Sequence, residues 1–203
     1  MTAISSTGEP AAPVLRPVDP AAYRPALLNV GVIVWLSSEL MFFSGLFAAY
    51  FTLRAATHPW PPAGSNLDVT SVGVATLFLL LSSGTMQMAV HRTIRGDLNG
   101  FLAWLVLTFV LGGLFVGMQA SDWAGRNFAV DSNAYGSAFY VLTGFHALHV
   151  MGGLFGMILM GVRAKASKHF GPRTAPSVEF LSYYWHFVDV VWIALFAAIF
   201  VIK

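Results

Sequence analysis

Long apolar runs, separated by short polar or proline-rich stretches, are the dominant pattern of this sequence. A helix that crosses a membrane needs about 20 consecutive, mostly apolar residues. Five segments reach that length, residues 28–53, 70–90, 100–120, 136–162 and 180–202, and all ten prolines lie outside them. Because proline lacks a backbone N–H donor and clashes with the preceding helical turn, its absence predicts five unbroken helices. The pattern therefore predicts an all-α integral membrane protein, a bundle of five transmembrane helices.

The composition supports this class of protein and excludes several others. Of the 203 residues, 57% are hydrophobic and 10% are charged, whereas an ordinary soluble domain is about 25% charged. Eleven Lys and Arg stand against nine Asp and Glu, without a basic tract, so we expect no nucleic-acid partner. The chain has no cysteine, which excludes disulfides, thiolate metal sites and a cysteine nucleophile.

The chain divides into two parts. Residues 1–26 are rich in proline and alanine, and they lack the basic start and short apolar core of a signal peptide. We expect them to form an extended cytoplasmic tail. Residues 27–203 make up the expected five-helix transmembrane domain.

The positions of lysine and arginine predict the orientation. With five spans, the N-terminal tail and the loops after the second and fourth spans share one side, which holds eight of the eleven basic residues. Basic loops face the cytoplasm, so the N-terminus is expected there and the C-terminus outside. Six basic residues in or next to the two loops are candidates for binding anionic lipid headgroups. They are Arg92, Arg95, Arg163, Lys165, Lys168 and Arg173.

Five ionisable residues lie inside the predicted spans. Glu39 and Asp189 lie near the centres of the first and fifth spans, where a charged side chain costs roughly 2.5–3.5 kcal/mol on insertion scales. His146 and His149 are three residues apart, as are His186 and Asp189, and residues at this spacing share a helix face. We expect a buried polar cluster of these five residues, with a hydrogen bond between His149 and Asp189.

Such a cluster has two interpretations. Two histidines three residues apart, together with two acids, are typical of a metal or proton site. The same groups can also hydrogen-bond across helices and hold the bundle together. The chain lacks the Glu-x-x-His pair of di-iron bundles and any cysteine ligand, so the second interpretation is favoured and we expect no metal.

Small residues predict close helix packing at two places. Gly113 and Gly117 in the third span, and Gly152 and Gly156 in the fourth, have the G-x-x-x-G spacing. This spacing lets two helix backbones approach each other in a membrane.

Five motifs, in the order of the chain, resemble those of cytochrome c oxidase subunit III. They are WLSSELMFF at Trp35–Phe43, WPPAG at Trp60–Gly64, QASDW at Gln119–Trp123, TGFHALHV at Thr143–Val150 and WHFVDVVW at Trp185–Trp192. The longer members of that family have seven helices. This chain resembles the short five-helix bacterial form, so a lipid site built between the two-helix and five-helix parts of the longer form does not carry over from the resemblance, whereas the five-helix part does.

The resemblance implies an accessory subunit of an aa3-type cytochrome c oxidase in the aerobic respiratory chain, in the bacterial plasma membrane. Such a subunit has no redox centre and no catalytic residue. Haem a and copper lie in the partner subunits I and II, and the accessory subunit packs on subunit I. It binds phospholipid, and it supports proton uptake and stability during turnover. The resemblance also implies that Glu39 reacts with hydrophobic carbodiimides. It is compatible with a larger respiratory supercomplex as a partner.

Two other functions remain open from the sequence. Subunit III of a haem–copper quinol oxidase has the same five-helix plan, but it tends to have Asp at the position of Glu39 and resembles the QASDW stretch less well. A proton-coupled transporter would use the intramembrane acids and histidines as a relay. Transporters commonly show internal repeats and interrupted helices, and neither is visible in this sequence.

Overall fold

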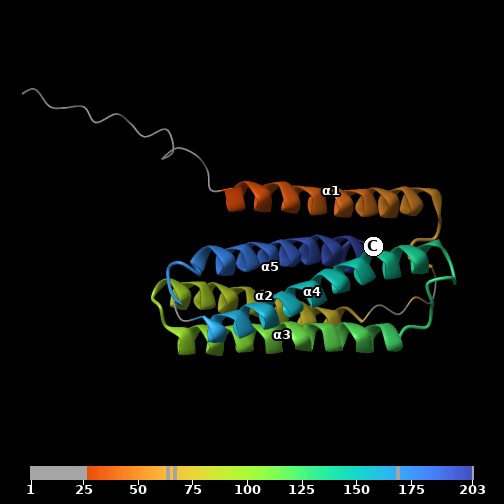
Figure 1. Cartoon of the computed structure of the whole chain (residues 1–203). Helices are drawn as coiled ribbons and strands as arrows, with labels where there is room; N and C mark the ends of the chain where they lie inside the picture. The colour runs from red at the N-terminus through yellow and green to blue at the C-terminus, as the bar shows by residue number, and fades with distance from the viewer. Residues whose placement is uncertain (1–26, 63–64, 66–67, 168–169, 203) are drawn as a thin grey trace, which may run out of the picture.

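The structure, a computed structural model, describes residues 27–62, 65, 68–167 and 170–202. Five α-helices follow one another in this part of the chain (Figure 1). They are α1 (Leu27–Ala56), α2 (Val69–Ile94), α3 (Leu98–Ala124), α4 (Ala134–Ala166) and α5 (Ala175–Phe196), and α5 continues into a π-helical turn, Ala197–Val201. All five are long and apolar enough to cross a membrane, which confirms the predicted all-α fold with five spans. The tail expected at residues 1–26 and the lipid-binding candidate Lys168 lie outside the described residues.

Polar caps make three of the helices begin slightly before the predicted apolar segments. The Asp68 carboxylate accepts hydrogen bonds from the first backbone N–H groups of α2, at 3.1 and 3.2 Å. Asp97 caps α3 through the Gly100 N–H at 2.9 Å, and Asn133 caps α4 through the Gly136 N–H at 2.8 Å. Such side chains satisfy backbone donors that have no partner within the helix. Polar residues therefore set these helix starts, which hydropathy alone does not locate.

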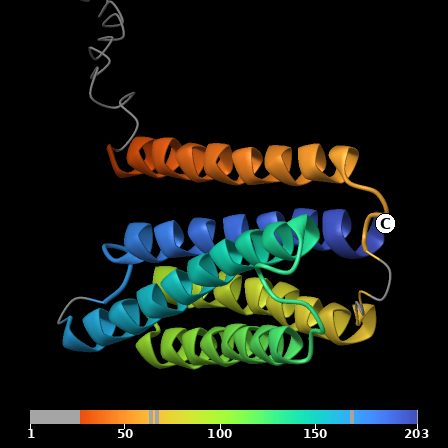
Figure 2. The ribbon, with the colours of Figure 1, turned by 90° about the vertical axis from the view of Figure 1, so that its right-hand side faces the viewer.

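The helices run alternately up and down, with α5 in the middle of the bundle and α1 at its edge (Figures 1 and 2). In the most apolar stretch of α5, 56% of the residues are buried, against 11% for α1. Among the described residues, α5 packs extensively against α2 and α4. The contacts of α1 with α4 and α5 are fewer. Most of the α1 surface therefore faces the surroundings of the chain.

Two tryptophans hold α5 in the core. Trp185 and Trp192 are fully buried. Their indole N–H groups donate hydrogen bonds to Ser82 Oγ and Thr76 Oγ1 on α2, each at 2.8 Å. A buried tryptophan needs such a partner for its N–H. The bonds therefore fix the rotation of α5 relative to α2.

The Trp185 ring also lies against glycines on two neighbouring helices. A Cβ atom built on Gly112 of α3 would lie 2.8 Å from the ring, and one on Gly153 of α4 would lie 2.6 Å from it. By contrast, a Cβ on Gly113 or Gly117 would meet nothing within 4 Å. The packing contact expected at Gly113 and Gly117 is therefore wrong within this chain, because α3 turns the neighbouring Gly112 inward.

An aromatic and charged group closes the end of the bundle where α3 ends and α4 begins. Arg126 pairs with Asp122 at 2.6 Å, and their side chains are only 2% and 5% exposed. The guanidinium carbon lies 5.2 Å from the ring centre of Phe139 and 5.8 Å from that of Phe200. A buried charge needs this kind of pairing to remain in an apolar environment.

Candidate functional site

Glu39 and His149 form the polar pair that the structure brings together at mid-depth. His149 Nε2 on α4 lies 3.1 Å from Glu39 Oε2 on α1. His149 Nδ1 lies 2.7 Å from the Phe145 carbonyl oxygen, which can only accept, so Nδ1 carries a proton. The bond from Nε2 to Oε2 then requires one further proton, held either by the imidazole or by the carboxyl group. The two residues therefore share a proton at the contact between α1 and α4.

The expected hydrogen bond between His149 and Asp189 is wrong. Both ring nitrogens of His149 are engaged elsewhere, and neither carboxyl oxygen of Asp189 has a hydrogen-bond partner among the described residues. Asp189 is only 4% exposed and lies beside Ser83 of α2. The reason is helix rotation, since the face of α4 with His149 meets α1, whereas Asp189 faces α2.

The remaining two histidines lie in separate environments. His186 bridges α5 and α2, because its Nδ1 makes a short hydrogen bond with Ser83 Oγ and its Nε2 lies 3.2 Å from Ser182 Oγ. His146 is fully buried, with its ring 4.8 Å from that of Trp192, and neither of its nitrogens has a hydrogen-bond partner among the described residues. Of the five ionisable residues, Glu39 and His149 are the pair that is directly hydrogen-bonded, whereas His186 and Asp189 both lie beside Ser83 of α2. No three His, Asp or Glu in the described part of the chain are arranged to hold a metal ion.

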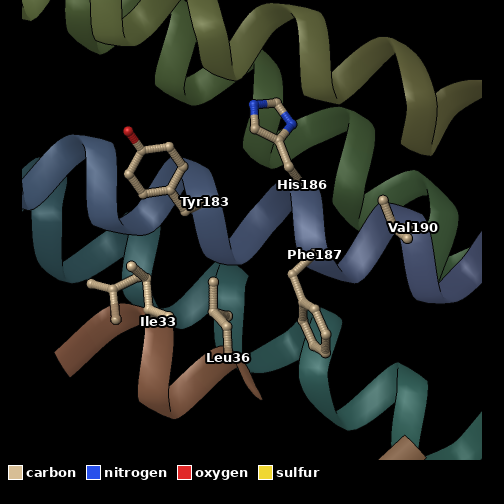
Figure 3. Close-up of a pocket in the computed structure, with 7 residues that line it drawn as sticks. Ile33, Leu36, Tyr183, His186, Phe187 and Val190 are labelled. Atoms are coloured by element: carbon tan, nitrogen blue, oxygen red, sulfur yellow. The ribbon is translucent and has the colours of Figure 1, made fainter. Parts of the chain in front are cut away.

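An apolar groove lies between α1 and α5 (Figure 3). Its volume is about 480 Å³. It is lined by Val32, Ile33 and Leu36 of α1 and by Tyr183, His186, Phe187 and Val190 of α5. Figure 3 shows Ile33 and Leu36 directed from α1 toward α5. The groove suits a hydrocarbon chain. Hydropathy does not predict the groove, because apolar residues occur throughout the spans.

A smaller polar pocket, of about 110 Å³, lies where α4 ends and α5 begins. Arg163 and Arg173 line it together with the hydroxyl residues Ser167, Thr174 and Ser177. Arginines, hydroxyl groups and a helix N-terminus form a donor set suited to a phosphate group. The two arginines are among the predicted lipid-binding residues, and the turn between α4 and α5 brings them together. The sequence gives no sign of the three hydroxyl residues, because serine and threonine are common in all loops.

The other basic candidates lie at the same end of the bundle. Arg92 pairs with Asp97 at 3.1 Å, and both side chains are partly exposed. Arg95 and Lys165 are exposed near the ends of α2 and α4. This end contains the connections from α2 to α3 and from α4 to α5 (Figure 1).

Five helices that are long and apolar enough to cross a membrane define a multi-pass integral membrane protein. A model of the family described as cytochrome c oxidase subunit III matches residues 23–202. The chain is 50% identical to the probable cytochrome c oxidase subunit 3 of Mycobacterium tuberculosis, over 89% of this chain and 90% of the relative. It is 43% identical to the subunit 3 of Corynebacterium diphtheriae, over 90% and 92%. It is 34% identical to that of Thermostichus vulcanus, over 91% and 92%. The chain belongs to the cytochrome c oxidase subunit III family.

Proposed function

We propose that this chain is the accessory subunit III of an aa3-type cytochrome c oxidase in the aerobic respiratory chain of a bacterial plasma membrane. It assembles with subunits I and II, which hold haem a and copper, and it packs on subunit I. Its N-terminus is cytoplasmic and its C-terminus external. The bacterial relatives named as cytochrome c oxidase subunits support this proposal, and they favour cytochrome c over a quinol as the electron donor.

One observation supports the proposal that this subunit has no catalytic centre of its own. Two of the three intramembrane histidines have both ring nitrogens bound to groups of the chain itself. The third, His146, is enclosed by the Trp192 and Phe115 rings, which offer no ligand atoms toward a metal. A metal site needs several converging ligands. The polar groups therefore serve the packing of the bundle and its partners rather than electron transfer.

Phospholipid binding is the second part of the proposal. The pocket of Arg163 and Arg173 offers donors for a lipid phosphate at the cytoplasmic end. The groove between α1 and α5 offers an apolar surface for an acyl chain. Basic groups near a membrane surface attract anionic lipid with about 1 kcal/mol each. Bound lipid of this kind would seal the contact with subunit I, and in this way the subunit supports proton uptake and stability during turnover.

Comparing intact oxidase with oxidase stripped of this chain tests the accessory function. The stripped enzyme is expected to keep its haem spectrum and its initial rate of oxygen consumption. Its proton uptake is expected to slow, and its activity to decay during turnover as phospholipid is lost. Immediate and complete loss of oxygen reduction, with subunits I and II intact, would contradict the proposal. Absorbance of copper in subunit II separates a cytochrome c oxidase from a quinol oxidase.

A double variant tests the lipid site. Arg163→Ala with Arg173→Ala is expected to lower the amount of anionic phospholipid that co-purifies with the oxidase, as measured by mass spectrometry. Arg54→Ala, which removes an arginine from the last turn of α1, at the end of the bundle opposite the connection from α4 to α5 (Figure 1), is the control. An unchanged lipid content in the double variant would exclude this pocket as the headgroup site.

A further inference from the structure

The pair of Glu39 and His149 lies at the middle of the membrane and is open to the side. Glu39 is the thirteenth of the 30 residues of α1, and His149 is the sixteenth of the 33 residues of α4. Their side chains are 23% and 17% exposed. Ionisable residues in a membrane almost always face a bundle interior or a water-filled cavity. A half-open acid at this depth therefore indicates that another molecule covers it.

Glu39 also has an unused hydrogen-bond acceptor. Its Oε2 is bound to His149, and its Oε1 makes no hydrogen bond with any described residue. Whichever residue holds the shared proton, Oε1 remains an acceptor. Hydrocarbon offers no donor, and a lipid headgroup lies at the membrane surface rather than at mid-depth. A donor side chain on another protein segment at this depth would complete the site.

A hollow lies on the same side, two helical turns away. It has a volume of about 160 Å³ and is lined by Leu46, Ala49, Tyr50 and Leu53 of α1 and by Ser137, Ala138, Val141 and Leu142 of α4. Leu46 follows Glu39 by seven residues, and Leu142 precedes His149 by seven. Because α1 and α4 run in opposite directions, both offsets lead the same way along the membrane normal.

Two aromatic rings lie between the polar pair and the hollow. Phe42 and Phe145 meet edge to face with their centres 5.0 Å apart, and each is 39% exposed. We call this surface the α1/α4 flank: Glu39, Phe42, Leu46, Ala138, Val141, Phe145 and His149. This surface has a polar site at Glu39 and His149 and an apolar hollow seven residues further along each helix. Seven residues is the spacing at which side chains repeat on one face of a packed helix.

We propose that the α1/α4 flank binds a transmembrane helix of another oxidase subunit. That helix presents a hydrogen-bond donor side chain to Glu39 Oε1 and, seven residues along, an apolar side chain to the hollow. The complementarity of acceptor and donor at mid-depth favours a protein helix over lipid. This inference rests on the proposed membership of a multi-subunit oxidase.

Photo-crosslinking in the assembled oxidase tests the inference. A benzophenone amino acid replaces Phe145 on the flank or, as control, Phe155, an exposed phenylalanine of the same helix. The Phe145 variant is expected to form an adduct with a transmembrane segment of another subunit, identified by its peptide masses, that carries a donor side chain at the site. An adduct with lipid alone, in a preparation that retains haem a, would overturn the inference. Failure to co-purify with haem a would instead contradict the proposed function.

Filling the hollow gives a second test that leaves Glu39 untouched. Val141→Trp adds bulk from a position that is 39% exposed, and Val162→Trp makes the same change at a 64% exposed position of the same helix. Val141→Trp is expected to abolish the crosslink from Phe145 and to cause loss of that subunit from the purified oxidase, whereas Val162→Trp retains both. Equal amounts of the subunit in the two variants would overturn the inference.

Discussion

Two adjacent glycines of α3 provide the sharpest test of the packing around α5. An alanine at position 112 would place its Cβ 2.8 and 2.9 Å from two atoms of the Trp185 ring and 3.0 Å from Leu154 Cδ2. The ring cannot easily move away, because it is fully buried, is bound to Ser82 and is backed by Gly153 of α4. An alanine at position 113 would meet nothing within 4 Å. The two substitutions are chemically identical, lie at the same depth and differ only in their neighbours.

The expected effects have opposite signs. Replacing glycine by alanine in a helix interior gains up to about 1 kcal/mol of helix propensity, and this is the whole expected effect at position 113. At position 112, adding a methyl group to a filled core costs about 1–3 kcal/mol. We therefore expect Gly112→Ala to lower the free energy of unfolding and Gly113→Ala to leave it unchanged or slightly higher. Thermal midpoints shift by about 2–4 °C per kcal/mol in soluble domains of similar length.

The assay is the thermal release of this chain from the purified oxidase, followed by gel or mass analysis after heating. Gly112→Ala is expected to release the chain at a lower temperature than the wild type, and Gly113→Ala is not. Trp185→Phe removes the ring atoms that the new methyl group would meet. Combined with Gly112→Ala, it should therefore cost less than the sum of the two single changes. Equal destabilisation by the two alanines, or strict additivity with Trp185→Phe, would contradict a clash between the new methyl group and the Trp185 ring.

Four further predictions follow from individual side chains. Ser82→Ala should destabilise the chain by about 1–3 kcal/mol in the same assay, because the buried N–H of Trp185 loses its acceptor; an unchanged midpoint would show that another acceptor replaces it. Arg126→Met should cost about 3–5 kcal/mol, since it leaves a buried carboxylate unpaired, and a neutral result would contradict the buried ion pair. Asp189→Asn should change stability by about 1 kcal/mol or less, because neither carboxyl oxygen has a hydrogen-bond partner among the described residues; a larger loss would reveal a hydrogen bond of that carboxyl group, with Ser83 as the neighbouring donor. Glu39→Gln should keep assembly and the haem spectrum but lose labelling by a hydrophobic carbodiimide, and persistent labelling would mean that the reagent attacks another acid.

Much of the fold follows from the sequence because hydropathy is a property of single segments. Each span is long and apolar enough to be recognised without reference to its neighbours, so the number of helices and their approximate bounds did not depend on packing. The caps at Asp68, Asp97 and Asn133 also have local sequence signals, although their effect on helix starts became clear only in the structure. The basic residues of the two loops were likewise identifiable, because charge patterns need no tertiary contact.

Only the tertiary structure decided which face of each helix meets which neighbour. Because a spanning helix is surrounded by apolar groups, its sequence shows no strong polar side. Residue spacing therefore did not predict that Gly112 rather than Gly113 faces the core. It also did not predict that His149 pairs with Glu39 rather than Asp189. These choices depend on the rotation of whole helices, which is fixed by bulky anchors such as Trp185 and Trp192 and their partners on α2. The sequence determined how many helices there are and which residues carry polar groups, whereas contacts between distant segments determined which of those groups meet.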